Sequence, residues 1–415
     1  MIKRKGNKFL FLNPAVPAWL VTNSNGANAL KLCNGKRSVR DISRRISILL
    51  NRDVTEEIRR FFQDVIAESS LLSSVTREPA IPKRHELYTV HLNLTNQCNL
   101  KCIYCYADER NNDGKRLDFD DYLPIIDSIN NLTRKAHIVL TGGEPLLVSY
   151  ALDIAEYAKK KGNSAQLLSN GILIQEENVE QIAQMFDLVK ISLDGSTSKI
   201  HDAHRGDGTF YKTMHAIELL LQKNANVQIA MTVTKRNLND LGNMAKKFGS
   251  LLSFAPLFNA GRAKGNKKLS ITGREYYKVL SSIENVNPLS YLCSSIDRSK
   301  NQRILKCAIG DAEISISETG DVYPCHLLHL PQFKAGNVRE QSLETIYQTS
   351  NNLHVCQRLN VLNVKGCKTC DLRFICGGAC RARAYYEKQK INVSDDFCVY
   401  EKQAYLNGLF ELHRF

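Results

Sequence analysis

The 415-residue sequence has no run of apolar residues long enough to cross a bilayer, which takes about 18 or more in succession. It also lacks the apolar core of a signal peptide, because polar residues, Pro14 and Pro17 interrupt the stretch behind the basic start of the chain. Both absences predict a cytoplasmic protein with no membrane partner. Apolar residues make up 43% of the chain and charged residues 24%, as in a globular protein with room for two or three domains.

The chain has fewer acidic than basic residues: 42 Asp and Glu against 56 Lys and Arg, which gives a net charge of +14. This balance permits an anionic partner, whether a nucleic acid, an acidic peptide or an acidic electron carrier. Recognition of a nucleic acid would favour a basic stripe with aromatic residues, whereas the basic residues here are spread along the whole chain. We therefore expect a basic, solvated surface and no nucleic-acid partner.

Cysteine, in contrast, is abundant: the chain has 13, and ten of them fall into spacings that suit metal clusters. Disulfides are typical of short secreted chains, and this chain is long and shows no signal. The first group is Cys98, Cys102 and Cys105. Three thiolates can ligate three irons of a four-iron cluster and leave the fourth iron open. Zinc, the alternative, usually takes four ligands in two pairs.

The periodicity predicts a parallel α/β architecture for the middle of the chain. Strands expected at 88–95, 137–141, 165–169, 188–193, 227–234 and 252–257 alternate with helices such as 120–132 and 210–222. Functional residues of parallel barrels gather at the C-terminal ends of the strands, and the first cysteine group directly follows the first strand.

The C-x3-C-x2-C spacing resembles the signature of the radical S-adenosylmethionine (SAM) enzymes, and the resemblance runs from Cys98 to the C-terminus. It implies an incomplete, TIM-like (βα)6 barrel over 88–290, open at one side to a bulky substrate such as a peptide. It also implies that the cluster reduces bound SAM to a 5′-deoxyadenosyl radical, which abstracts a hydrogen atom from the substrate. The segments that resemble the family's SAM site contain Tyr104, Gly142, Gly143, Glu144, Pro145, Ser169, Ser192, Asp194 and Arg205.

Roles in this site follow from the resemblance. The Gly142–Pro145 segment would hold the methionine amino group, with its glycines allowing a close approach to the ligand. Ser192 and Asp194 would face the ribose and methionine groups, and Arg205 would pair with the SAM carboxylate. Each residue alone could equally be a cap, a turn or a surface hydrogen bond.

Residues 1–75 read as a separate small domain. Short strands are expected at 9–12 and 18–21, followed by helices at 27–33, 38–49 with Ser38 as N-cap, and 55–72. The pattern resembles the PqqD-like leader-peptide recognition domain, which has a winged-helix shape and binds a peptide leader as an added strand. A winged-helix domain with another task, including DNA binding, is the alternative. Pro79 and Pro82 mark 76–87 as a linker.

Strand–helix alternation is expected to cease from Cys307, where a cysteine-rich domain with little core of its own begins. The cysteine order over 291–415 resembles the SPASM pattern, which implies two auxiliary 4Fe-4S clusters beside the SAM-binding one. One would be held by Cys367, Cys370, Cys376 and Cys398, and the other by Cys307, Cys325 and Cys380 with Cys293 as candidate fourth ligand. Without Cys293, that cluster would have an open iron. Two zinc knuckles are the alternative, and Cys33 and Cys356 are expected to be free buried thiols.

SPASM enzymes include anaerobic sulfatase maturases and peptide maturases. In the former an Asp base follows the cysteine that matches Cys325, whereas this chain has His326. We therefore expect a peptide maturase that forms thioether crosslinks, as in sactipeptides and ranthipeptides. Its partners would be a precursor peptide and a low-potential donor, flavodoxin or ferredoxin. The alternatives are carbon–carbon crosslinking, epimerisation, quinone-cofactor or anaerobic sulfatase maturation, and an iron–sulfur redox-sensing regulator. The pattern names no catalytic acid or base.

Overall fold

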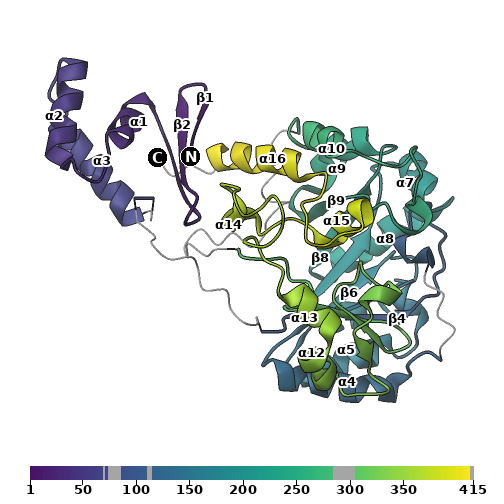
Figure 1. The fold of residues 1–415 in the computed structure, drawn as a ribbon. Coiled ribbons are helices and arrows are strands. Elements are labelled where there is room, and N and C mark those ends of the chain that lie inside the picture. The colour runs from purple at the N-terminus through teal and green to yellow at the C-terminus, as the bar shows by residue number, and fades with distance from the viewer. Residues whose placement is uncertain (69–70, 73–85, 110–114, 284–303, 412–415) are drawn as a thin grey trace.

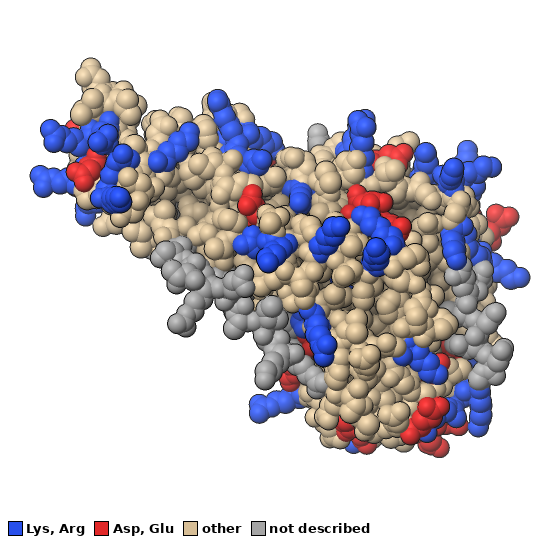
Figure 2. Space-filling view, in the orientation of Figure 1, with Lys and Arg blue, Asp and Glu red and all other residues tan. Residues whose placement is uncertain are grey.

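The structure is a computed structural model that describes residues 1–68, 71–72, 86–109, 115–283 and 304–411. A small N-terminal unit lies at one end of the molecule, beside the last helix of the chain, and a large α/β unit forms the other end (Figure 1). Cys293 and most of the expected linker lie outside the described residues. Lys and Arg side chains are scattered over the visible face, and several lie on the surface of the N-terminal helices (Figure 2).

The N-terminal unit is a three-stranded antiparallel sheet followed by three helices. The strands pair in the order β1-β2-β3 and are β1 (Ile2–Lys5), β2 (Lys8–Asn13) and β3 (Ala18–Thr22). The helices are α1 (Ser24–Lys31), α2 (Val39–Leu50) and α3 (Thr55–Glu68). Ser38 caps α2 as predicted, in a reciprocal capping box with Asp41. Strand β1 was not predicted because it is polar and exposed, and only its pairing with β2 makes it a strand.

Strands β2 and β3 of the small sheet are buried on both faces, because apolar residues occupy both sides of these strands. Phe11 and Leu20 pack against the three helices of the unit. On the opposite face Leu10, Leu12 and Val21 pack against α16 (Cys398–Glu411) and α14 (Arg373–Cys376). The N-terminal unit is therefore attached to the C-terminal cysteine-rich part of the chain through its sheet.

The large unit confirms the predicted α/β class with a parallel sheet. Its six parallel strands follow one another in chain order across the sheet. They are β4 (Thr89–Thr95), β5 (His137–Gly142), β6 (Ser164–Ser169), β7 (Leu188–Ser192), β8 (Val227–Val233) and β9 (Leu252–Pro256). The arrangement is consistent with a partial TIM-like barrel.

Helices follow the parallel strands and cover the outside of the sheet, as crossover connections require. They are α4 (Phe119–Leu132), α5 (Ala151–Lys160), α6 (Val179–Met185), α7 (Ser198–Arg205), α8 (Thr209–Gln222), α9 (Leu241–Phe248) and α10 (Gly273–Leu280). One large apolar core lies between these helices and the outward residues of the strands, such as Val90, Leu92 and Leu94 of β4.

In the described residues the strand–helix alternation ceases after Cys307, as predicted, because three short strands come first and only helices follow them. The short strands themselves were not predicted. Strand β10 (Glu313–Ile316) lies parallel to β4 on the edge that the six strands leave open, and β11 (Asp321–Tyr323) and β12 (Gly336–Asn337) extend the sheet antiparallel to it. These strands are two to four residues long, too short for a visible period. The remaining helices are α12 (Leu343–Thr349), α13 (Asn351–Gln357) and α15 (Arg381–Lys388). No described helix has the length and apolar character to cross a membrane.

Candidate functional site

The first cysteine group lies in an irregular loop directly after β4, at the C-terminal edge of the parallel strands. Backbone hydrogen bonds hold the loop from two sides: Ile103 N donates to His204 O at 3.0 Å, and Arg262 N donates to Cys105 O at 3.0 Å. The three thiols lie close enough to influence one another. Burial, then the Glu144 carboxylate and the other two thiolates, raise the pKa of Cys98. Burial, then the Asp194 carboxylate and the Cys105 thiolate, raise the pKa of Cys102. Such thiols need a metal cation to become thiolates, so their grouping fits an iron–sulfur cluster.

Gly142 and Gly143 clamp the base of this loop. Gly143 N donates to Thr95 O at 2.7 Å and Glu144 N to Gln97 O at 2.9 Å, so the segment continues the pairing of β5 with β4 beyond the sheet. A Cβ on Gly143 would stand 2.0 Å from Gln97 O, and one on Gly142 would stand 2.3 Å from Thr95 O. The glycines were predicted to allow close approach to a ligand; in the structure they allow close approach to the backbone of the cysteine loop.

Glu144 is completely buried and links the ends of two strands. Its carboxylate accepts hydrogen bonds from Ser169 Oγ at 2.8 Å and Asn170 N at 2.9 Å. Burial raises its pKa to about 7, although these hydrogen bonds act in the opposite direction. Asn170, which the site prediction omitted, donates from Nδ2 to Asn99 Oδ1 at 2.7 Å and so reaches the cysteine loop. The Ser-Asn-Gly order after a strand was the only signal for it.

Tyr104, Asp194 and Arg205 form one buried network beside the cysteine loop. Arg205 Nε lies 2.5 Å from Asp194 Oδ2, and Arg205 Nη2 donates to Tyr104 Oη at 2.5 Å. Tyr104 Oη also hydrogen-bonds Asp194. Burial alone would raise the pKa of Asp194, but the Arg205 guanidinium and the Tyr104 hydroxyl lower it overall. Arg205 was predicted to pair with the SAM carboxylate. In the structure it forms an ion pair with Asp194, and its Nη1 lies 3.9 Å from Cys102 Sγ.

Ser192 ends β7 on the same side as these groups. It remains partly accessible, whereas Val189 and Ile191 of the same strand are fully buried in the core. The structure thus gathers Ser192, the cysteine loop, the Gly142–Pro145 segment and the Tyr104–Asp194–Arg205 network at one edge of the sheet. This fits a ligand with amine, carboxylate and ribose groups lying next to a cluster. Ligation by the three cysteines and SAM binding by these residues stay predictions.

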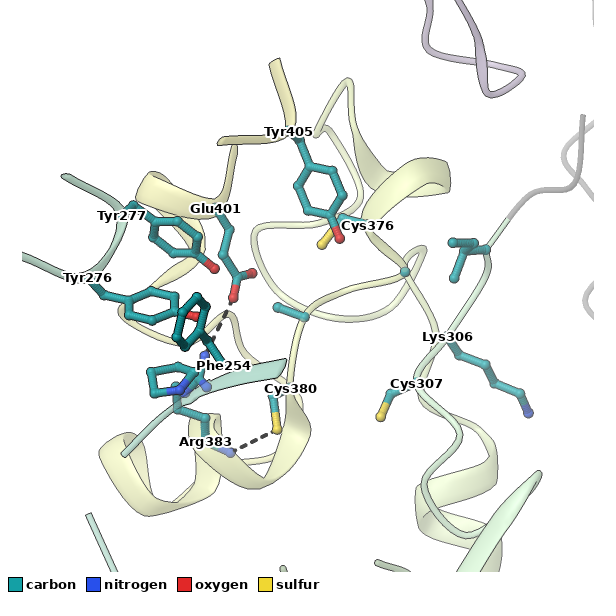
Figure 3. Close-up of a pocket in the computed structure, with 14 residues that line it drawn as sticks. Phe254, Tyr276, Tyr277, Lys306, Cys307, Cys376, Cys380, Arg383, Glu401 and Tyr405 are labelled. Carbon is teal, nitrogen blue, oxygen red and sulfur yellow. Dashed lines mark hydrogen bonds and ion pairs between the residues drawn. The ribbon is translucent and has the colours of Figure 1, made fainter. Parts of the chain in front are cut away.

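The C-terminal cysteines fall into two spatial groups. Cys307 and Cys380 line a cavity of about 390 Å³ that also meets β9 at Phe254 and Pro256, and Cys376 of the second group lines the same cavity (Figure 3). Burial, then the Glu313 carboxylate and the thiols of Cys307 and Cys380 raise the pKa of Cys325, so these three thiols are neighbours. Cys356, expected to be a free thiol, is buried and near Cys307, and burial and that thiol raise its pKa to about 12.

The second group joins the other four cysteines of the predicted SPASM pattern. Cys398 interacts electrostatically with Cys367, Cys367 with Cys370, and Cys376 with Cys398. The grouping is the one predicted from the family resemblance, and the ligand roles stay predictions. Cys33 is half-buried in the N-terminal unit, far along the chain from these sets, with its thiol 3.7 Å from Ala29 O.

Cationic side chains stand beside both groups of thiols. The charge of Arg381 acts on Cys307 and Cys367, and Lys402 interacts with Cys370 and Cys398. The backbone N–H of Arg383 donates to Cys380 Sγ at 3.5 Å (Figure 3), and the guanidinium charge of Arg383 also acts on that thiol. These cations offset part of the negative charge that a group of thiolates around a metal centre carries.

His326 follows Cys325 and enters a cluster of three titratable groups inside the barrel. His326 Nδ1 lies 2.8 Å from Glu313 Oε1, and His91 Nε2 of β4 lies 3.5 Å from the same oxygen. Burial would raise the pKa of Glu313, but its hydrogen bond to His326 and the charges of both histidines lower it to about 2. Burial, together with the His326 charge, lowers the pKa of His91 to about 3. An ionised Glu313 thus orients His326.

Two family models match the chain. Residues 92–248 match the radical SAM superfamily, and residues 307–371 match the SPASM iron–sulfur cluster-binding domain. The barrel is a radical SAM domain. It is joined to a C-terminal SPASM domain, and the protein is an enzyme that uses radical SAM chemistry.

Curated relatives agree with this assignment. The AdoMet-dependent heme synthase of Methanosarcina barkeri is 29% identical over 74% of this chain and 95% of its own length. The subtilosin biosynthesis protein AlbA of Bacillus subtilis is 29% identical over 62% of this chain and 58% of its own length.

Solved radical SAM structures share the fold. The enzyme anSMEcpe with bound AdoMet superposes with a TM-score of 0.65 and 21% identity, over 79% of this chain and 95% of that one. SuiB of Streptococcus suis bound to its precursor peptide SuiA superposes with a TM-score of 0.59 and 14% identity, over 96% of this chain and 98% of that one. The superposition on SuiB therefore includes the N-terminal unit as well as the radical SAM domain.

Proposed function

We propose that this enzyme binds the leader of a ribosomally made precursor peptide on its N-terminal unit and oxidatively forms thioether crosslinks in the peptide. The observation that carries the proposal is the outer edge of β3. Within the described part of the chain β3 pairs with β2 alone, so its other edge can accept an extended peptide as a fourth strand. The SuiB structure, alike over 96% of this chain, was solved with a precursor peptide, which supports the same use here.

The attachment of the small sheet supports a connection between leader binding and chemistry. The face of the sheet that carries Leu10, Leu12 and Val21 packs on α16 and α14, and the partly buried Cys370 and Cys376 belong to the same apolar cluster. A leader bound to β3 would therefore lie on a unit that packs directly against the second cysteine group, which contains Cys370 and Cys376. The rest of the peptide then extends from a fixed origin toward the barrel.

Forming a thioether from a thiol and a C–H group removes one hydrogen atom, one proton and one electron from the substrate. When bound, SAM would supply the radical that takes the hydrogen atom, and an auxiliary cluster would accept the electron. The chain itself must accept the proton. His326 is positioned for this: when Nδ1–H donates to Glu313 Oε1, the ring carries its lone pair at Nε2, and the ionised Glu313 stabilises the protonated ring.

The proposal is tested by co-expressing the enzyme with short Cys-containing reading frames that neighbour its gene, under anaerobic conditions. We expect a peptide that loses the mass of two hydrogen atoms per crosslink and a Cys that no longer reacts with an alkylating reagent. Cys102→Ala should abolish the change because it removes a ligand of the proposed SAM-binding cluster. Cys33→Ala, which removes a thiol outside all three groups, should leave it intact.

Three results would contradict parts of the proposal. Epimerised residues or carbon–carbon links with intact thiols would refute thioether formation and retain peptide modification. Binding of the precursor that persists when its leader is deleted would refute leader recognition. Salt-dependent DNA binding without SAM turnover would favour the redox-sensing regulator instead.

A further inference from the structure

The six consecutive strands β4 to β9 contain a single Lys or Arg, Lys190 of β7, and no Asp or Glu, whereas the added parallel strand β10 carries Glu313. A charged residue within a barrel strand is costly to bury, so its presence among otherwise neutral strands needs a compensating role. Lys190 is not among the residues assigned above to the proposed SAM site or to the cysteine groups.

Lys190 faces the inside of the barrel. Its neighbours Val189 and Ile191 are completely buried in the outer core, and side chains alternate along a strand. Pairing places Lys190 level with Leu168 of β6 and Gln228 of β8. The Lys190 charge also acts on His91 of β4, three strands away in the sheet, because the curvature of the sheet brings both side chains into one interior.

The ammonium group has no counter-charge in the described residues. Lys190 makes no hydrogen bond and no ion pair there, and burial lowers its pKa. Leu168 and Gln228 are neutral, and His91 is neutral at pH 7 because its pKa is about 3. The Glu313 carboxylate of β10 is already paired with His326 and His91. Lys190 thus offers an unmatched cation to whatever enters the barrel.

The position along the strand brings such a ligand close to the chemistry. Ser192 lies two residues further along the same face of β7, about 7 Å away at the rise of a strand. The SAM-site residues gather at that edge, so a group bound by Lys190 lies one layer of side chains below them. A single ammonium beside the neutral amide of Gln228 suits a monoanion, and the monoanion that a peptide offers is a carboxylate.

We propose that Lys190 binds a carboxylate of the substrate inside the barrel, so that the reacting carbon lies close to an acidic side chain or to the C-terminal carboxylate of the peptide. The peptide nature of the substrate rests on the function proposed above. SAM carries a carboxylate too, and the experiments separate these two sources of the same chemistry.

The first experiment measures protection of Lys190 in the reconstituted full-length enzyme. The protein is treated anaerobically with an amine-acetylating reagent, and the rate at Lys190 is compared by mass spectrometry with that at the exposed Lys246. The probes are N-acetylglutamate α-amide and its matched amide, N-acetylglutamine amide, at equal ionic strength. We expect the acid to slow acetylation of Lys190 at least threefold, with no effect of the amide and no change at Lys246. Equal rates with and without the acid would overturn the proposal.

The second experiment uses Lys190→Gln, with Lys246→Gln as control. If Lys190 binds the substrate, the dissociation constant of SAM stays within twofold of the wild-type value in both variants. A tenfold weaker SAM complex in Lys190→Gln alone would assign the cation to SAM and overturn the proposal.

The third experiment uses a precursor peptide that the wild-type enzyme modifies. Lys190→Gln should raise the KM for this peptide at least tenfold, and Lys190→Arg should raise it less. Converting one carboxylate of the peptide to the amide, either an Asp or Glu side chain or the C-terminus, should raise the KM of the wild-type enzyme by a similar factor. An unchanged KM would overturn the proposal. If no peptide is modified while the acid probe still protects Lys190, the proposed function fails and the carboxylate site stands.

Discussion

Substitution of Gly143 by Ala tests whether the Gly142–Pro145 segment serves to hold the cysteine loop. The added Cβ would stand 2.0 Å from Gln97 O and 2.5 Å from Gln97 C, both of them backbone atoms. Real Cβ contacts essentially never fall below 3.0 Å, so the loop must move by about 1 Å. This movement breaks or stretches two backbone hydrogen bonds, those from Gly143 N to Thr95 O and from Glu144 N to Gln97 O.

We expect Gly143→Ala to lower the free energy of unfolding by about 2–4 kcal/mol, since each lost bond costs about 1 kcal/mol and leaves a buried polar group unsatisfied. The measurement is urea unfolding of the metal-free protein, followed by circular dichroism. Because Cys98 follows Gln97 directly, reconstituted protein should also lose about four irons per chain, the content of one cluster.

Gly242→Ala is the matched control. Gly242 lies in α9 with ordinary backbone geometry, and a Cβ there would meet nothing within 4 Å. The helix should gain up to about 1 kcal/mol, because Ala has the higher helix propensity. If Gly143→Ala unfolded like the wild type and kept its full iron content, the close approach of the two segments would have no structural role and the reasoning would be refuted.

Three further predictions follow from buried groups. Asp194→Asn leaves the Arg205 cation buried without a carboxylate and should cost about 3–5 kcal/mol in urea unfolding, whereas Asp207→Asn at the surface should change stability by less than about 0.5 kcal/mol. Burial raises the pKa of Glu144 from 4.5 to about 7, so its contribution to stability is complete below pH 4.5 and is lost as the pH rises through about 7. The difference in unfolding free energy between wild type and Glu144→Gln should therefore fall by about 3 kcal/mol across that range, and a constant difference would contradict the assignment. Leu10→Ala should cost about 2–5 kcal/mol at the contact of the small sheet with α16 and speed hydrogen exchange in α16, while Ile48→Ala, 73% exposed, should change neither.

The bounds of the barrel strands and the grouping of the cysteines could be predicted closely from the sequence. Each barrel strand lies within one or two residues of its predicted bounds, because alternation and β-branched residues are properties of a short segment. Short elements escaped prediction for the same reason. Strand β1 is exposed and polar, and β10 is four residues long, so that neither carries a period of its own.

The roles of individual site residues depended more on partners distant in the sequence. Glu144 was expected at a ligand, and the structure shows its carboxylate held by Ser169 and Asn170. Lys190 was not singled out at all, because one Lys in a strand is unremarkable until its neighbours are known to be neutral.

The sequence by itself determined which residues could ligate clusters and which segments would be strands, since both depend on residue type and local spacing. Only the tertiary structure decided that β2 and β3 of the N-terminal unit are buried on two faces, that Arg205 pairs with Asp194, and that β10 adds to the edge of the barrel. These contacts join segments up to hundreds of residues apart. They are selected by the curvature of the sheet and by the cost of burying charges without partners, and neither can be read from a local pattern.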